Sequence, residues 1–530
     1  MSIWIHRLDP GTDATTGALA GLRLAVKDNV DVGGVPTTAG CPGYSFVPQR
    51  DAPAVAALRS EGAVVVGKTN LDQFATGLVG TRSPYGAVSD SRRPEFISGG
   101  SSSGSAVAVA TGAADIAIGT DTAGSGRIPA ALQGIVGIKP TVGVISTEGV
   151  IPACRSYDCV TIFATDLGTA DRAMGVMAAG APDRPWPSEF RLAAPPRPTV
   201  AVFAELPGLD PQWRTAFERT VTTLRQRGAT IVEIDPAPFL AAARLLYDGA
   251  LVAERYAAVG EFVDANPDGV DPTVGGIIRA AKDIPAHRLV ADRAELERLR
   301  TQAMAALSGA DALLAPTAPA HPTIAAVAAD PVGVNSLMGT YTNFCNLFDL
   351  CAVAVPSASA GESCFGVTVF ARPFEDAVAA DLAALITGSD PIARPWPLAA
   401  APPCELIVFG AHLRGQPLEH QLHALGARWA GEVSTAPAYR LAALDTTPPK
   451  PAVTRCEGGV AVAGERWLLS PAALGRFLAN LPAPMQLGAV ELDDGSWHTA
   501  FGCDGEAAAA GKDLSEYGSW RAALAAGAVG

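Results

Sequence analysis

Short apolar strands alternate with helices over most of this chain, and this alternation restricts the possible folds more than any other feature. Residues 22–27 alternate between an apolar and a more polar face. Further apolar runs occur at residues 63–66, 199–203, 230–234 and 312–315. Helical patterns separate them, at residues 52–61, 211–227, 239–263 and 289–307, with another just after 98–105. Strands separated by helices pack in layers, so the sequence predicts an α/β fold with a central mixed sheet.

A proline-rich stretch near residue 400 divides the chain. Residues 388–403 contain five prolines and little periodicity, which is typical of a semi-stiff linker. A new strand with the sequence ELIVFG follows it. We therefore predict a large domain over residues 1–390, a linker over 391–403 and a small domain over 404–530.

Charge and hydropathy exclude several classes of protein. Apolar residues make up 48% of the chain and charged residues 17%, so it is not a disordered chain. The formal net charge is −14 and no run of Lys and Arg occurs, which argues against nucleic-acid binding. The long uncharged stretch at residues 312–329 is interrupted by prolines, and the N-terminus has no apolar segment. Neither a membrane-spanning helix nor a signal peptide is expected.

The cysteines give no sign of a metal site. The nine cysteines are scattered, without a Cys-x-x-Cys pair or a Cys/His set at the spacing of zinc ligands. Reduced, buried thiols in a cytoplasmic protein are the simplest interpretation. We expect neither a metal nor a cofactor.

Two clusters of serine and glycine are candidates for the chemistry. The first is SGGSSSGS at 98–105, and the second is GTDTAGSGR at 119–127. Small residues let backbone N–H groups converge on a reacting oxygen, although a flexible loop or an anion-binding nest fits either cluster alone. Lys27 ends the first strand, and a lysine becomes a base when burial lowers its pKa. No motif surrounds the histidines before the linker, which disfavours a Ser-His-Asp triad.

Together these segments resemble the amidase signature family. Lys27 stands in VKDN, both clusters follow it in the family's order, and the segments GKTN at 67–70 and GIKPT at 137–141 belong to the same pattern. The resemblance covers about residues 20–385.

The resemblance implies a Ser-Ser-Lys triad. Ser125 would be the nucleophile, Ser101, held in a cis peptide, would relay the proton, and Lys27 would be the base. The oxyanion hole would consist of the backbone N–H groups of Thr122, Ala123, Gly124 and Ser125. Many members have glycine where this chain has Ala123, and alanine tolerates a positive φ less well, so a slightly different loop geometry is expected.

Arg255 lies on an apolar stripe of the helix expected over 239–263. No carboxylate occupies its neighbouring positions on that helix. Because an unpaired buried charge is costly, the partner would be either a remote Asp or Glu or a carboxylate on the substrate. Tyr247 lies eight residues earlier, about 12 Å along the axis of a continuous helix, and on nearly the same face.

Tyr247, Arg255, the segments FATGLVGTRSPYG and GTYTNFCNLFDL and the small C-terminal domain resemble the allophanate hydrolases of this family. The resemblance implies that allophanate, a urea carrying an N-carboxylate, is the substrate. Tyr247 and Arg255 would bind its carboxylate, and Gly77 would lie in the substrate cradle. Ser125 would attack the amide carbonyl and release ammonia, and water would free N-carboxycarbamate, which goes on to carbon dioxide and ammonia as in urea degradation. A functional link to a urea carboxylase follows.

The small domain resembles the allophanate hydrolase C-terminal domain, a γ-glutamylcyclotransferase-like β-barrel. In that family it is linked to decarboxylation of the first product. His412 is the first candidate residue there and His498 the second, although a structural role fits each of them too. A homodimer is also implied, but only 26 residues precede Lys27, fewer than the family's dimer-forming N-terminal helices need.

Other functions remain open. The same triad would serve an amidase of other small carboxylated amides, of the malonamidate or biuret type. An ammonia-supplying amidase subunit of an amidotransferase would need partner subunits, and the extra C-terminal domain argues against it. A non-enzymatic scaffold is disfavoured because all three triad residues are present.

Overall fold

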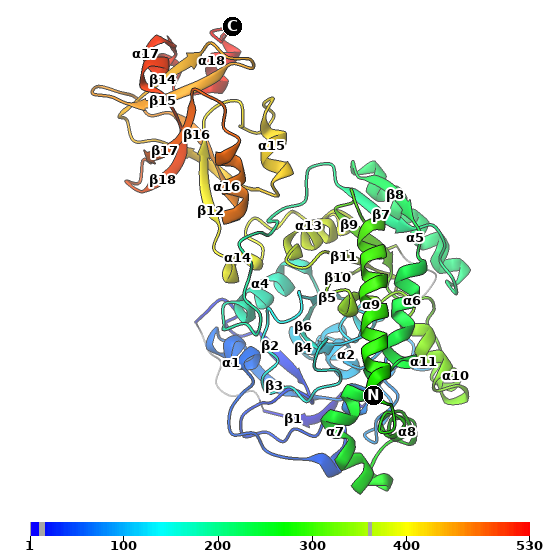
Figure 1. Cartoon of the computed structure of the whole chain (residues 1–530). Helices are drawn as coiled ribbons and strands as arrows, with labels where there is room; N and C mark the ends of the chain where they lie inside the picture. Colours follow the sequence, from blue (N-terminus) through cyan, green and yellow to red (C-terminus); the bar gives the residue numbers. More distant parts are fainter. Residues whose placement is uncertain (1, 10–15, 359–362, 530) are drawn as a thin grey trace. The chain divides into compact units, whose positions relative to one another are not determined.

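The computed structural model describes residues 2–9, 16–358 and 363–529, which form two compact units (Figure 1). The first unit contains residues 1–186 and 197–400, and the second contains residues 187–196 and 401–530. The chain therefore passes into the second unit twice, first for a short segment and later for a whole domain.

An eleven-stranded sheet forms the centre of the first unit. In spatial order its strands are β1 (Trp4–Arg7), β3 (Val64–Thr69), β2 (Arg23–Lys27), β4 (Ile116–Asp121), β6 (Cys159–Ala164), β5 (Val136–Lys139), β10 (Cys351–Pro356), β11 (Gly366–Ala371), β9 (Ala312–Pro316), β7 (Thr199–Phe203) and β8 (Thr230–Ile234). β2 runs parallel to β3 and β4, and β7 runs parallel to β8 and β9. The other neighbours are antiparallel. The predicted α/β fold with a mixed sheet is confirmed.

Helices cover this sheet. They are α1 (Pro53–Ser60), α2 (Ser103–Ala110), α3 (Ile128–Gln133), α4 (Leu167–Ala178), α5 (Pro211–Gln226), α6 (Ala237–Asp248), α7 (Ala253–Ala265), α8 (Pro272–Ala280), α9 (Ala286–Ala306), α10 (Ile324–Ala329), α11 (Gly333–Met338), α12 (Phe344–Leu347), α13 (Asp376–Thr387) and α14 (Pro397–Ala400). α2 packs directly on the sheet, because its small Ser, Gly, Ala and Val side chains let it approach closely and are buried almost all round. Among the described residues, no helix has the length and apolar character needed to cross a membrane.

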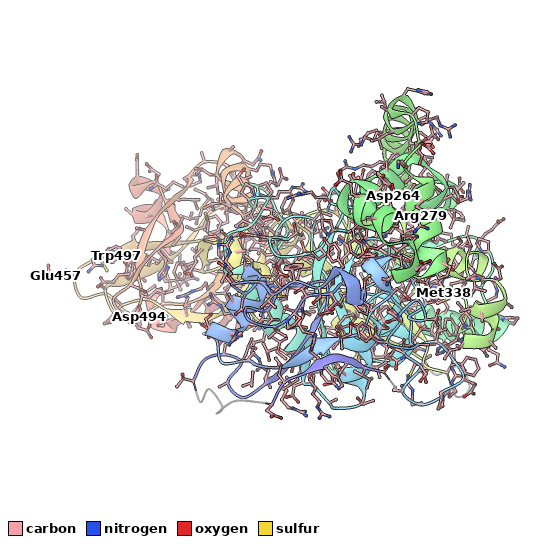
Figure 2. The ribbon with its side chains drawn as sticks, turned by 90° about the horizontal axis from the view of Figure 1, so that it is seen from below. Asp264, Arg279, Met338, Glu457, Asp494 and Trp497 are labelled. Atoms are coloured by element: carbon pink, nitrogen blue, oxygen red, sulfur yellow. The ribbon has the colours of Figure 1, made fainter. Side chains whose placement is uncertain are left out.

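The prediction of a single helix over 239–263 is wrong. The helix breaks at Gly249, whose backbone is extended, and a 3-10 turn, η3 (Ala250–Val252), separates α6 from α7. Asp292 of α9, which lies beside α6 (Figure 1), accepts a hydrogen bond of 2.6 Å from the Ala250 N–H at the break. The apolar periodicity continues through the break and therefore hides it. After the break, the Arg279 Nε of α8 lies 3.9 Å from a carboxylate oxygen of Asp264 of α7 (Figure 2).

The second unit is built on two sheets. The five-stranded sheet has the order β13 (Arg428–Ser434), β16 (Ala463–Leu469), β12 (Cys404–Val408), β18 (Trp497–Cys503), β17 (Met485–Glu491), and the three-stranded sheet has the order β15 (Lys450–Arg455), β14 (Tyr439–Leu444), β19 (Lys512–Asp513). Its helices are α15 (Glu419–Ala424), α16 (Pro471–Ala479), α17 (Gly505–Ala510) and α18 (Trp520–Ala525). Thr435, just after β13, and Leu492, just after β17, form a β-bridge. This bridge joins the chain beyond the two edge strands, so the larger sheet closes at that end as a barrel does.

Two stretches at the domain boundary pack onto these units. In the predicted linker, Trp396 is buried in the first unit and its backbone N–H donates to Asp171 at 3.1 Å. The segment 187–196 packs into the second unit, where the Leu192 N–H donates to the Gly426 carbonyl at 2.8 Å.

Candidate active site

Lys27 lies at the carboxyl end of β2, between β3 and β4 in the sheet. Its side chain is 0% exposed, and its amine donates hydrogen bonds to the hydroxyls of Ser101 at 2.8 Å and Thr120 at 2.7 Å. Thr120 belongs to the parallel neighbour β4, whose carboxyl end meets that of β2 at the same edge. Burial lowers the pKa of Lys27 to about 7, against the opposing effect of nearby carboxylates. A large share of the amine is therefore neutral near neutral pH and able to accept a proton.

Ser101 is held directly in front of α2. The peptide bond between Gly100 and Ser101 is cis, as the family resemblance implies, and the side chain of Ser101 is fully buried. Gly100 leaves no room for a side chain, because a Cβ there would lie 2.1 Å from a carboxylate oxygen of Asp72. The Asp72 N–H in turn donates to the Ser101 carbonyl at 3.2 Å. These contacts place the Ser101 hydroxyl against Lys27.

Ser125 lies in the loop that joins β4 to α3. A buried ion pair of 2.8 Å between Asp121 and Arg127 closes this loop, and the Gly126 N–H donates to the same carboxylate at 2.9 Å. The Arg127 guanidinium outweighs the effect of burial and holds the pKa of Asp121 below its usual value. Ser125 is 4% exposed, and within the described residues its hydroxyl makes no hydrogen bond to Ser101 or Lys27. The structure thus joins Lys27 and Ser101 directly and leaves the Ser125 hydroxyl free.

The same loop presents unbonded backbone N–H groups. In the described part of the chain, no hydrogen-bond acceptor is found for those of Thr122, Ala123, Gly124 or Ser125. Gly124 has a φ of +151°, and a Cβ there would lie 2.4 Å from the Thr342 hydroxyl, so only glycine fits. Ala123 does not adopt a positive φ, which explains why alanine is accommodated there. Free N–H groups in a fixed loop suit a developing oxyanion.

Two further family motifs support this edge of the sheet. Lys68, from GKTN, forms a fully buried ion pair of 3.0 Å with Asp28, the residue after Lys27. Lys139, from GIKPT, is also fully buried, and its amine donates to the Pro140 carbonyl at 2.7 Å. Both lysines hold the framework around the site.

Tyr247 and Arg255 converge because the helix between them is broken. The Arg255 guanidinium lies 5.5 Å from the centre of the Tyr247 ring, across the break at Gly249. Arg255 is 3% exposed and donates to the Thr76 hydroxyl at 3.0 Å and, weakly, to the Ala75 carbonyl at 3.5 Å. No carboxylate among the described residues forms an ion pair with it. A direct ion pair with a remote Asp or Glu is therefore not found there, and the buried Asp158 carboxylate interacts with the guanidinium only through its charge.

Gly77 follows Thr76 in the loop that contacts Arg255. A Cβ on Gly77 would lie 2.5 Å from the carboxylate of Asp72, which accepts hydrogen bonds from the N–H groups of Gly80 and Arg82, both at 2.9 Å. The loop wraps around Asp72, and the glycine allows the close approach. Gly77 is thus near the Arg255 guanidinium, because Thr76, the residue before it, accepts a hydrogen bond from that guanidinium.

Several residues of the site escaped the sequence analysis. Thr120 lies inside the second serine-glycine cluster but carried no signal of its own as a partner of Lys27. Asp158 is buried, accepts a hydrogen bond from the Thr122 hydroxyl and from the Ala153 N–H at 2.9 Å, and has a pKa raised by burial. Thr342 leaves its buried hydroxyl without a partner beside Gly124. These roles depend on contacts between distant segments.

His412 lines a cavity of about 440 Å³ in the second unit. Its ring stacks on Phe501, with ring centres 4.9 Å apart, and its Nε2 lies 2.9 Å from the side-chain oxygen of Gln421. Burial lowers the pKa of His412, which favours the neutral imidazole. The cations Lys450 and Arg476 line the same cavity.

His498 has a different environment, on β18 next to Trp497 (Figure 2). Its Nδ1 lies 2.8 Å from a carboxylate oxygen of Glu405, and its Nε2 lies 2.7 Å from the Ser496 hydroxyl. It is absent from the lining of the His412 cavity. Of the two candidates, His412 is the one that lines this cavity.

Comparisons with known proteins show which family models and relatives this chain matches. The family model described as Amidase matches residues 6–379, and the model described as Allophanate hydrolase C-terminal domain matches residues 404–525. Urea amidolyase of Saccharomyces cerevisiae is 40% identical over 540 residues, which cover 95% of this chain but 29% of that protein. The allophanate hydrolase structure from Kluyveromyces lactis is 37% identical, with a TM-score of 0.87, covering 96% of this chain and 88% of that one. Indoleacetamide hydrolase of Pseudomonas syringae is 38% identical, but over only 42% of this chain and 48% of that protein.

Proposed function

Because this chain belongs to the amidase family and ends in an allophanate hydrolase C-terminal domain, we propose that it hydrolyses allophanate. It is a hydrolase of C–N amide bonds by family. The chain spans less than a third of the urea amidolyase it matches, so its own substrate rests on the site. The observation that carries the proposal is Arg255, buried beside the active-site loops with no ion-paired carboxylate among the described residues.

Arg255 suits a substrate that brings its own carboxylate. A guanidinium binds a carboxylate through two parallel hydrogen bonds, and such charge-assisted bonds are stronger than neutral ones. The Thr76 hydroxyl accepts a hydrogen bond from one nitrogen of the guanidinium, and the Tyr247 ring centre lies 5.5 Å from it. Allophanate, with a carboxylate on one end and an amide on the other, fits a site with a cation and a nucleophile.

The first half-reaction uses the triad. Neutral Lys27 accepts a proton through the Ser101 hydroxyl as Ser125 attacks the amide carbonyl of allophanate. The N–H groups of the 122–125 loop bind the resulting oxyanion. The proton returns from Lys27 to the leaving nitrogen, ammonia departs, and the remaining acyl group stays as an ester on Ser125.

The second half-reaction regenerates the enzyme. Water gives up a proton along the same Ser101–Lys27 relay and attacks the ester. N-carboxycarbamate leaves, and Ser125 recovers its hydroxyl. In sum, allophanate and one water yield N-carboxycarbamate and one ammonia.

The cavity of the second unit would act on this product. N-carboxycarbamate carries two carboxylates, and Lys450 and Arg476 supply positive charge around His412. We place the loss of carbon dioxide here, followed by release of the second ammonia. His412 and its contact with Gln421 would orient the dianion.

Partners follow from the chemistry of the substrate. An enzyme of the urea carboxylase class must make allophanate. Urea amidolyases suggest such a pairing, because a minor part of their own length matches nearly the whole of this chain. A homodimer and a cytoplasmic location complete the proposal. No nucleic acid, membrane, metal or cofactor enters it.

Release of ammonia from allophanate tests the proposal. The whole chain is compared on allophanate, malonamate, biuret and a neutral aliphatic amide. We expect kcat/KM for allophanate to exceed that for the neutral amide by at least about ten-fold, since one charge-assisted interaction contributes about 1.5–3 kcal/mol. A higher kcat/KM on malonamate or biuret would assign the site to that class of amides instead.

A further inference from the structure

The catalytic side chains of the first unit are almost inaccessible, so a substrate needs a defined route to them. Lys27 and Ser101 are fully buried, and Ser125 and Arg255 are 4% and 3% exposed. A cavity of about 390 Å³ lies next to this site, between α6 and the segment around α11. Met338, the last residue of α11, marks this region in Figure 2.

The cavity and the active site share a thin wall. Tyr247 lines the cavity, and its ring lies 5.5 Å from the Arg255 guanidinium on the inner side. Asn343 lines the cavity as well, and the preceding residue, Thr342, touches the oxyanion loop at Gly124. Tyr247 thus lies beside the Arg255 guanidinium, and Asn343 follows the residue that contacts the oxyanion loop. Both cavity-lining residues are therefore neighbours of groups that would bind substrate.

The wall residue Tyr247 sits at a discontinuity of the backbone. It is the penultimate residue of α6, and the extended Gly249 follows directly. A Cβ on Gly249 would lie 2.6 Å from the Leu245 carbonyl, so the break requires glycine. Tyr247 therefore lies in the last turn of α6, directly before the chain changes direction toward Arg255.

Arg244 gives the cavity an unpaired positive charge. It lies one turn before Tyr247 on α6, is exposed and lines the cavity. Within the described ranges, no carboxylate lies at ion-pair distance from it, and Asp248 is the other charged residue of the lining. Asp248 lies four residues later on the same helix and offsets part of this charge, so Arg244 acts as a local contact for an approaching anion.

We propose that this cavity is the vestibule through which a small carboxylated amide reaches Ser125, with Arg244 as its first contact and Tyr247 as the wall between it and Arg255. The proposal rests on the proposed function, because that function requires an anionic substrate. The carboxylate passes from the exposed Arg244 to the buried Arg255, with Tyr247 between them. Arg244 acts on the approach of the substrate and not on the chemical step.

The role of Arg244 is tested with Arg244→Gln and a matched control, Arg172→Gln. Arg172 is an exposed arginine on α4, outside this cavity, so both variants change the net charge equally. At low ionic strength we expect Arg244→Gln to lower kcat/KM for allophanate by about three- to ten-fold with kcat unchanged, and the difference to vanish at high salt. Equal kcat/KM values for the two variants would overturn the role of Arg244.

The route itself is tested by filling the vestibule. Ser336→Trp places an indole at a residue that lines it, and Val332→Trp places one at an exposed residue of the same region outside it. Ser336→Trp should lower kcat/KM for charged and neutral amides by about ten-fold or more relative to Val332→Trp. Equal values for both tryptophan variants would overturn the route.

One measurement separates this proposal from the proposed function. If the wild-type chain releases no ammonia from allophanate, the proposed function fails. The rate at which a small fluorophosphonate labels Ser125 still reports on access. Slower labelling of Ser336→Trp than of Val332→Trp would keep the route, and equal labelling rates would overturn it.

Discussion

The amine of Lys27 lies 2.8 Å from the hydroxyl of Ser101, in a place where neither side chain touches solvent. This contact couples a base with a lowered pKa to a hydroxyl that can pass a proton on. The catalytic consequences of the site can be measured one group at a time.

The pH dependence of kcat/KM reports the protonation of Lys27. Burial lowers its pKa to about 7, and only the neutral amine can act as base, so kcat/KM should rise with pH up to about 7 and then level off. Thr120→Val removes a hydrogen-bond acceptor that favours the ammonium form, so it should move this limb to lower pH and reduce kcat by about ten-fold. Thr120→Ser, which keeps the acceptor, is the control. If the rise of kcat/KM with pH occurs at the same pH in Thr120→Val as in the wild type, the assignment of this rise to Lys27 is contradicted.

The two relay residues should act as a unit. Lys27→Ala and Ser101→Ala are each expected to lower kcat by about three orders of magnitude or more, and the double variant by little more than either. Ser125→Ala sets the lower limit, since loss of the nucleophile leaves only the residual effect of binding and the oxyanion loop. Circular dichroism shows whether each variant is folded. Losses that add in log kcat would mean that Lys27 and Ser101 work independently.

Gly124→Ala should damage the oxyanion loop. The substitution places a Cβ on a backbone with a φ of +151° and against the Thr342 hydroxyl. We expect kcat to fall by about ten- to a hundred-fold, and Gly124→Ala combined with Thr342→Ala to recover part of it by relieving the contact. Ala123→Gly, at a residue without positive φ, serves as the control and should change kcat little. Full activity of Gly124→Ala would argue against a rigid loop.

Arg255→Gln should separate charged from neutral substrates. Loss of charge-assisted hydrogen bonds should lower kcat/KM for allophanate by about ten-fold to a few hundred-fold and spare a neutral amide. Arg255 also contributes to lowering the pKa of Lys27, so the pH limb measured on the neutral amide should move upward in the variant. An equal loss on both substrates, together with a lower Tm, would indicate a structural arginine instead.

His412→Ala should slow the release of carbon dioxide and of the second ammonia without slowing the release of the first ammonia. The first ammonia should appear at the wild-type rate, because the triad lies in the other unit. Release of carbon dioxide and of the second ammonia should slow by about ten-fold or more. His498→Ala, outside the His412 cavity, is the matched control and should affect neither. Loss of both steps in His412→Ala would point to a folding defect, which the Tm would reveal.

Local patterns sufficed for much of the fold. Strands β7 and β8 occupy the predicted residues 199–203 and 230–234, because each is a short apolar run bounded by breakers. The break at Gly249 was missed, since a glycine inside a helical pattern is usually tolerated and the decisive contact comes from Asp292.

The site likewise contains residues that could be predicted from the sequence and residues that could not. Lys27, Ser101 and Ser125 could be chosen because they lie in ordered motifs of the chain. Thr120, Asp158 and Thr342 could not, because their importance arises from hydrogen bonds or close contacts between segments far apart in sequence. The convergence of Tyr247 and Arg255 was predicted for the wrong reason, a continuous helix.

The segment 187–196 has a consequence for the modularity of this protein. Its ten residues belong to the second unit, where Leu192 is fully buried and Glu189 forms a 2.8 Å ion pair with Arg476. A shortened chain that ends near residue 400 would therefore keep an apolar segment stripped of its partners, which favours aggregation. The isolated second unit would lack one piece of its own core. Exchange of either unit between proteins thus needs two splice points, and a functional dissection should replace 187–196 with a short polar loop.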